Sequence, residues 1–89
     1  MKAIVTVIGR DRVGIIALVS QLLAARGVNV LDISQTVMQG YFTMIMLVDA
    51  SACSENFADL AGELASEGED HGLQIRIQRE DIFNAMHRI

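Results

Sequence analysis

Three observations predict an α+β sandwich for this 89-residue chain. Short runs rich in β-branched residues alternate with two longer runs whose apolar residues recur every three or four positions. Glycines stand where several of these runs end. The resulting order is strand, helix, strand, strand, helix, strand. Right-handed crossovers close it as a four-stranded antiparallel sheet with two helices on one face, the ferredoxin-like βαββαβ arrangement.

The first strand and the first helix are predicted from a change of apolar spacing. Residues 2–9, KAIVTVIG, are dense in β-branched side chains and predict a strand. Residues 13–26 carry apolar side chains at helical spacing, and Gly27 predicts a left-handed stop at the end of that helix.

A hairpin follows the first helix. Residues 28–39 and 41–50 are two strand-like runs, and the glycine between them, Gly40, indicates a tight turn. In the second run, both faces of the strand are apolar. Phe42, Met44, Met46 and Val48 point one way, and Tyr41, Thr43, Ile45 and Leu47 point the other.

The second half of the chain predicts a helix, a strand and a short final helix. Ser54 is the expected N-cap of the second helix. That helix buries Phe57, Leu60, Ala61 and Leu64 on one face. Residues 72–78 alternate apolar and polar side chains, which predicts a half-exposed strand. The last segment, EDIFNAMHRI, places Ile82, Phe83, Met86 and Ile89 on one helical stripe.

The composition narrows the class of protein. Hydrophobic residues make up 52% of the chain and aromatic residues only 4%, so we expect one domain over residues 1–89 with an aliphatic core. A formal charge of −4 disfavours nucleic acid and anionic membranes as partners. The single cysteine, Cys53, cannot form an internal disulfide, and no signal or anchor pattern is present. We therefore expect a cytoplasmic protein.

We expect the second apolar face of the sheet to be buried by another segment or by another chain. Helices of this fold cover only one face, and monomers rarely expose a large apolar patch. Either the C-terminal stripe folds over the second face, or a second copy of the chain covers it, or both contribute. We expect a homodimer.

The motif GRDRVGIIALVSQLLAARGVNVLDISQ, together with YFTMIMLVD and EDIFNAMHRI, resembles the ACT domain, a small-molecule-sensing module of βαββαβ order. The resemblance covers essentially the whole chain. It is closest to the short stand-alone ACT proteins of bacteria and archaea, and it extends more loosely to the ACT proteins similar to glycine-cleavage repressors.

The resemblance implies a ligand site between two copies. In the family, an amino acid or similar ligand lies between the first strand-to-helix loop of one copy and the start of the second strand of another. The positions that match are Asp11, Arg12, Val13, Gly14, Ile15, Asn29 and Val30. Many ligand-binding members have proline before the glycine, whereas this sequence has Val13.

Elementary chemistry supports a role in ligand binding for two of these positions. Gly14 has no Cβ, so a ligand carboxylate can approach the free N–H groups of the first helical turn. Asn29 offers both a donor and an acceptor to an amino acid. The alternative is an ordinary turn in which Asp11 caps the helix, Arg10 and Arg12 are solvated, and Asn29 closes the turn after Gly27.

Other polar features favour simpler interpretations. The acidic side chains Glu55, Asp59, Glu63 and Glu67 repeat every four residues and predict a solvated helix face, with a surface for a basic partner as the alternative. Residues 69–71 lie too close in sequence to converge on a metal ion. Cys53 is expected to be an ordinary free thiol, and most methionines are expected to fill gaps in the core.

Two functional hypotheses remain from the sequence. The first is a regulatory homodimer that senses an amino acid or a related small metabolite at its interface and acts on a protein partner that the sequence does not specify. The second is a protein-interaction module without a small-molecule ligand. We expect no enzyme, no metal and no cofactor, because the sequence has no nucleophile with a nearby base, no phosphate-binding glycine-rich loop and no convergent carboxylate pair.

Overall fold

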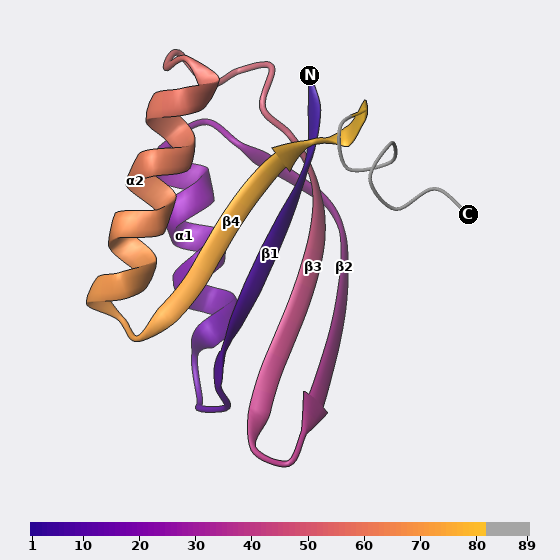
Figure 1. The fold of residues 1–89 in the computed structure, drawn as a ribbon. Helices are drawn as coiled ribbons and strands as arrows, with labels where there is room; N and C mark the ends of the chain where they lie inside the picture. The colour runs from indigo at the N-terminus through magenta and orange to yellow at the C-terminus, as the bar shows by residue number, and fades with distance from the viewer. Residues whose placement is uncertain (82–89) are drawn as a thin grey trace.

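The computed structural model describes residues 1–81 and has the predicted order of elements (Figure 1). These elements are β1 (Lys2–Arg10), α1 (Ile15–Ala25), β2 (Asn29–Met38), β3 (Tyr41–Asp49), α2 (Phe57–Asp70) and β4 (Leu73–Arg79). The strands form one antiparallel sheet in the order β2-β3-β1-β4. The ferredoxin-like fold is therefore confirmed, with β1 and β3 in the centre. From Ile82 on, the predicted C-terminal helix lies outside the described residues.

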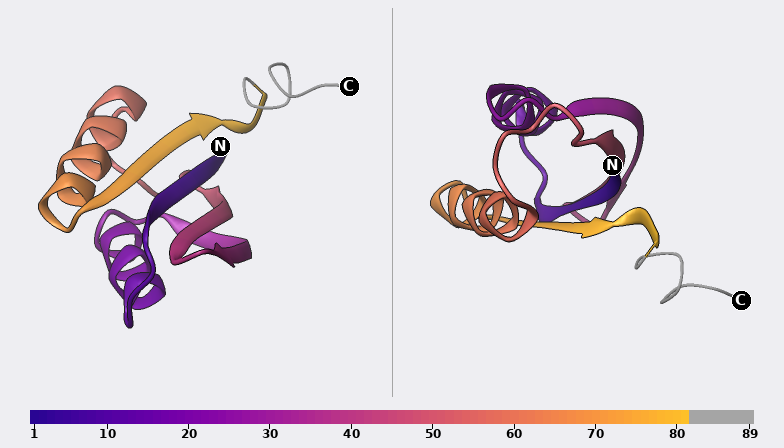
Figure 2. Two further views of the ribbon diagram at one scale, coloured as in Figure 1. Left: turned by 60° about the horizontal axis from the view of Figure 1, so that its bottom comes forward. Right: turned by 90° about the horizontal axis from the view of Figure 1, so that it is seen from above.

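Both helices lie on the same side of the sheet (Figure 2). Alternate residues of the two central strands are buried beneath them, as the alternation in the sequence predicts. The largest fully buried side chains are Leu23, Met44, Met46, Leu60, Leu64, Ile75, Val5, Val7, Val19 and Val48. No polar or charged side chain among residues 1–81 is buried. The core is thus aliphatic, and two of the methionines fill it.

The other side of the sheet carries an apolar strip, which we call the open face. It consists of Ile4 and Ile8 on β1 together with Ile45 and Leu47 on β3. Ile8 and Ile45 are 43% and 42% exposed. The prediction that both faces of the third strand are apolar is confirmed.

The end of α1 is a Schellman motif. Gly27 has a φ of 74°, and its N–H donates to the Ala24 carbonyl while that of Val28 donates to Leu23. The side chains of Leu23 and Val28 are both buried. A Cβ on Gly27 would lie 2.8 Å from the Ala52 carbonyl oxygen. Both the left-handed backbone and this close approach require glycine at the predicted stop.

The β2–β3 hairpin has a two-residue turn. Gln39 and Gly40 have φ angles of 52° and 82°, and Met38 pairs with Tyr41. Positive φ at both central residues matches the twist of the flanking strands. The tight turn predicted from Gly40 is confirmed.

The N-cap predicted for the second helix is wrong. The cap of α2 is Asn56, whose Oδ1 accepts a hydrogen bond of 2.8 Å from the Asp59 N–H, and not Ser54. Asn56 lies directly before the first helical residue, Phe57, so its side chain reaches the free N–H groups of the first turn. The helix therefore begins later than the serine predicts.

Candidate ligand-binding site

The loop between β1 and α1, residues 11–14, is held against the hairpin turn. The Asp11 N–H donates a hydrogen bond of 2.9 Å to the Gly40 carbonyl. At the other end of the loop, the Gly14 carbonyl accepts a hydrogen bond of 2.9 Å from the Leu18 N–H, which starts α1. The loop and the hairpin turn therefore form one end of the molecule, at the bottom of Figure 1.

Gly14 is the N-cap of α1, and the interpretation of Asp11 as the cap is wrong. Gly14 has a φ of 91°, and no side chain accepts a hydrogen bond from the first turn. A Cβ built on Gly14 would have no neighbour within 4 Å. Glycine is thus required there by the backbone conformation and not by crowding. The N–H end of α1 is left uncapped and accessible, as the proposed contact with a carboxylate requires.

The two arginines beside the loop have neighbours within the chain. The Arg10 guanidinium lies 5.2 Å from the centre of the Tyr41 ring, a cation–π contact. Arg12 Nη1 lies 3.8 Å from the position that a Cβ on Gly72 would take. Both side chains are exposed at the protein surface. Neither of these two contacts directs an arginine to the helix N-terminus.

The apolar residues of the predicted site differ in exposure. Val13 is fully exposed at the tip of the loop. Ile15 is only 2% exposed, and its side chain belongs to the core. Val30 is half-buried and packs against that core. Only the backbone of Ile15 is available to a ligand, whereas Val13 offers its whole side chain.

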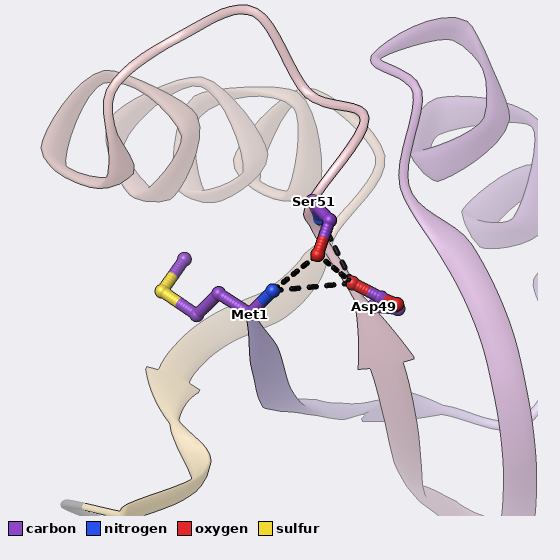
Figure 3. Close-up of polar contacts among 3 residues, drawn as sticks. All are labelled: Met1, Asp49 and Ser51. Atoms are coloured by element: carbon purple, nitrogen blue, oxygen red, sulfur yellow. Dashed lines mark hydrogen bonds and ion pairs between the residues drawn. The ribbon is translucent and has the colours of Figure 1, made fainter.

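Asn29 is the exposed first residue of β2 and pairs with Asp49 across the β2–β3 ladder. Asp49 belongs to a polar cluster that the sequence reasoning missed (Figure 3). Asp49 Oδ1 accepts hydrogen bonds from the Ser51 N–H at 2.9 Å and from the Ser51 hydroxyl at 2.6 Å. The N-terminal ammonium of Met1 lies 3.3 Å from the same oxygen and also contacts the Ser51 hydroxyl.

This cluster fixes the charge of Asp49. The hydrogen bonds from Ser51, first from its hydroxyl and then from its N–H, lower the pKa of Asp49 to about 2. The carboxylate is therefore ionised at neutral pH and lies beside Asn29. The spacing Asp-x-Ser could have predicted this cluster, because an Asp side chain commonly accepts a hydrogen bond from the backbone N–H two residues later.

Within one chain, the two halves of the predicted site lie at opposite ends of the sheet. Arg10, which precedes the loop, pairs with Tyr41, whereas Asn29 pairs with Asp49, which in turn pairs with Lys2. Eight residue steps along β1 separate these ends, about 26 Å at the usual rise of a strand. One chain therefore cannot bring Gly14 and Asn29 to the same small ligand.

The acidic stripe on α2 meets a base within the chain. Arg26 Nε lies 3.0 Å from Glu63 Oε1, and Arg26 Nη2 lies 3.9 Å from Glu67 Oε1. Arg26 also donates a hydrogen bond of 3.0 Å to the Leu22 carbonyl. Two of the four acidic residues thus join α2 to the end of α1, which neither interpretation of the stripe anticipated.

Glu55 and Glu63, beside this ion pair, shift each other's pKa in opposite directions. Glu55 Oε2 is shielded from solvent and has no donor among the described residues. A hydrogen bond with Glu63, which requires one carboxyl to be protonated, raises the pKa of Glu55. The same hydrogen bond, followed by that from Arg26, lowers the pKa of Glu63. Of the two carboxyls, Glu55 therefore keeps a proton to the higher pH.

Residues 1–81 lack two features that would indicate other kinds of site. This part of the chain has no group of three or more His, Cys, Asp or Glu side chains placed to hold a metal ion. None of its helices combines the length and the apolar character needed to cross a bilayer. Cys53 is a half-buried free thiol, which packs against the core.

Comparison with known proteins identifies the class of this fold. Residues 2–78 match the family model of the ACT domain. An ACT domain protein from Streptococcus pneumoniae has a structure of TM-score 0.83 at 45% identity, covering 98% of each chain. A putative glycine cleavage system transcriptional repressor matches with a TM-score of 0.71 at 26% identity, over 86% of this chain and 44% of that one.

Full-length relatives place the chain more narrowly. A UPF0237 protein of Listeria monocytogenes is 53% identical over 100% of both chains. A UPF0237 protein of Methanocaldococcus jannaschii is 52% identical over 99% of this chain and 98% of its own length. The chain belongs to the ACT domain family, among the stand-alone UPF0237 proteins of bacteria and archaea.

Proposed function

We propose that this protein is a regulatory module that works as a homodimer and senses an amino acid or a related small metabolite between its two copies. One observation carries the proposal. The uncapped loop around Gly14 and the polar start of β2 at Asn29 lie at opposite ends of one sheet. A small ligand can touch both only if they come from different copies.

The edge strand β2 supplies a surface for the second copy. Its ten residues pair only with β3 in the described part of the chain, and all but Val30 are exposed. Its exposed apolar side chains are Leu31, Ile33, Val37 and Met38. Proteins usually protect such an edge with lysine, proline or a short strand. β2 contains neither lysine nor proline, and only the register shift at Leu31 interrupts its pairing with β3.

Antiparallel pairing of two β2 strands would complete the site. A twofold axis near the middle of β2 brings the start of that strand in one copy beside its end in the other. The end of β2 leads into the turn at Gly40, to which the loop is bound through Asp11. Each copy thus offers its loop to the Asn29 of its partner, and the dimer has two equivalent sites.

The chemistry of the two halves suits an amino acid. The free N–H groups of α1 and its positive end favour a carboxylate. Asn29 and the ionised Asp49 supply an amide and a negative charge at the other half, where an ammonium group would bind. Similarity to a putative transcriptional repressor supports a regulatory role.

A thermal-shift screen of the twenty amino acids at millimolar concentration tests this function. A ligand at ten times its Kd adds about 1.4 kcal/mol to the stability of the folded state. In a domain of this size, that is a rise in Tm of several degrees. The proposal fails if no amino acid raises the Tm of the wild-type protein.

Two exposed polar residues on the two edge strands provide a matched pair for the same screen. Asn29→Ala should abolish the ligand-induced shift, because it removes the donor and acceptor at the start of β2. Gln74→Ala, on β4, should keep the shift. Equal loss in both variants would mean that the shift does not come from a site at Asn29.

A further inference from the structure

Residues 50–56, which we call the β3–α2 connection, lie against the end of α1. A Cβ on Gly27 would lie 2.8 Å from the Ala52 carbonyl oxygen, so the two backbones are in close contact. The next residue, Cys53, is half-buried and packs against the core. In Figure 1, the connection lies at the top, at the opposite end of the molecule from the loop before α1. Movement of this connection away from α1 would therefore expose the Cys53 thiol.

Hydrogen bonds hold both ends of the connection. At its start, the Ser51 N–H and hydroxyl donate to Asp49. At its other end, the Asn56 side chain caps α2. Between these ends, the side chain of Glu55 makes a hydrogen bond with Glu63 on α2. Glu55 thus joins the middle of the connection to a helix.

The charged groups that face Glu55 come from both helices of the described chain. On α2 they are Asp59 and Glu63, and on α1 there is Arg26. The Arg26 side chain is only 15% exposed, and it contacts Glu63 at 3.0 Å and Glu67 at 3.9 Å. An ionised Glu55 therefore adds a third carboxylate around one guanidinium.

The protonation of Glu55 decides whether its contact with Glu63 attracts or repels. A protonated Glu55 donates a hydrogen bond to the Glu63 carboxylate, which Arg26 holds in place. An ionised Glu55 has no proton to donate, and its shielded Oε2 has no donor among residues 1–81. A shielded charge without a partner, beside a like charge, favours the movement of Glu55 into water.

We propose that the β3–α2 connection is a pH-sensitive latch: a protonated Glu55 holds it against the two helices, and loss of this proton loosens it and exposes Cys53. This inference does not rest on the proposed ligand-sensing function. The latch lies next to one half of the proposed site, because Ser51 binds the Asp49 that pairs with Asn29.

The rate at which Cys53 reacts with dithiodipyridine, which also modifies thiols in acid, tests the latch. Cys53 is the only cysteine in the chain. The thiolate fraction of any cysteine rises with pH, so each rate is divided by that of Glu55→Gln at the same pH. The glutamine amide donates to Glu63 at every pH and keeps the latch closed. We expect the ratio of the wild-type rate to the variant rate to be about 1 at pH 4 and severalfold higher at pH 8.

Two further variants make this measurement specific. Glu55→Ala removes the donor, so its rate at pH 4 should exceed that of Glu55→Gln severalfold. Glu69→Gln, an exposed change on α2, should keep the pH dependence of the wild type. A wild-type ratio that is the same at pH 4 and pH 8 would overturn the proposal, and so would equal rates for Glu55→Ala and Glu55→Gln at pH 4.

Hydrogen exchange of the wild-type protein is a second measurement, and it needs no substitution. The Cys53 N–H donates a hydrogen bond of 3.0 Å to the Ala50 carbonyl within the connection. Its protection factor, which corrects for the pH dependence of chemical exchange, should fall severalfold between pH 4 and pH 8. The Gly72 N–H, which donates to the Glu69 carbonyl in another turn, is the internal control and should keep its protection. An equal change at both amides would contradict a local latch.

Discussion

At the scale of single residues, the loop before α1 depends on a backbone conformation that the sequence does not display. Gly14 has a positive φ and open space around it, so its role as N-cap follows from the path of the chain. Asp11 has the side chain of a good cap but lies three residues too early. The position of the loop could be predicted from the sequence. Which of its residues caps the helix depends on the path of the backbone.

The opposite pKa shifts of Glu55 and Glu63 predict that the stability of the protein depends on pH. Because folding raises the pKa of Glu55, its contribution to stability is present below the unfolded pKa and is lost as the pH rises through the folded pKa. Glu55→Gln keeps a donor toward Glu63 at every pH. We expect the Tm of the variant to match that of the wild type at pH 4 and to exceed it at pH 7.

Thermal melts over this pH range check the prediction. The matched control is Glu69→Gln, an exposed change of the same kind on the same helix. It should show no comparable gain at pH 7. A Glu55→Gln variant that is less stable than the wild type at pH 7 would mean that folding does not raise the pKa of Glu55. The lowered pKa of Glu63 acts in the opposite sense in the wild-type protein.

At the scale of elements, the strands and helices were predictable because each follows a local apolar period. The contacts between these elements were not predictable from the sequence. Arg26 and Glu63 are 37 positions apart, so only the packing of α1 beside α2 brings them together. The N-cap of α2 was also not predictable from the sequence, although the two candidate residues lie close together in the chain. Ser54 and Asn56 are both favoured cap residues, and the start of the helix at Phe57 decides between them.

The packing of α2 on β4 predicts opposite effects for two glycines of one helix. A Cβ on Gly68 would lie 2.8 Å from the Leu73 carbonyl oxygen and 2.9 Å from Ile75 Cγ1. Gly68→Ala should therefore destabilise the protein by about 1–3 kcal/mol, because a backbone atom cannot move aside.

Gly62 is the control for this substitution. A Cβ there would have no neighbour within 4 Å, so Gly62→Ala should stabilise α2 by about 0.5–1 kcal/mol through helix propensity. Urea unfolding measures both free energies. Stabilisation by Gly68→Ala would show that α2 and β4 are not in such close contact.

At the scale of the whole molecule, the two predicted halves of the site lie at opposite ends of the sheet. This separation follows from the order of elements, since a strand and the helix that returns from it place their connections at opposite ends. The sequence could therefore name Gly14 and Asn29 as candidates, and the fold shows that one small ligand could contact both only between two copies. The cluster of Asp49 and Ser51 beside Asn29 became apparent only from the strand register.

A charge on the edge strand should dissociate the proposed dimer. Ile33 lies in the middle of β2 and is 39% exposed. Ile33→Lys places two like charges near the twofold axis, and edge lysines oppose strand pairing. We expect the variant to sediment as a monomer at micromolar concentration. Gln74→Lys puts the same charge on the other edge strand and should leave the dimer intact.

The most direct test of a site built from two copies is to mix two inactive variants. Gly14→Ala alters the loop, and Asn29→Ala alters the start of β2, so neither homodimer should bind the amino acid that stabilises the wild-type protein. In a heterodimer, one of the two sites has both of its halves intact. After exchange at equal concentrations, calorimetry should recover binding at about a quarter of the wild-type number of sites. Recovery of no sites on mixing, with both variants folded and dimeric, would contradict a site shared between two copies.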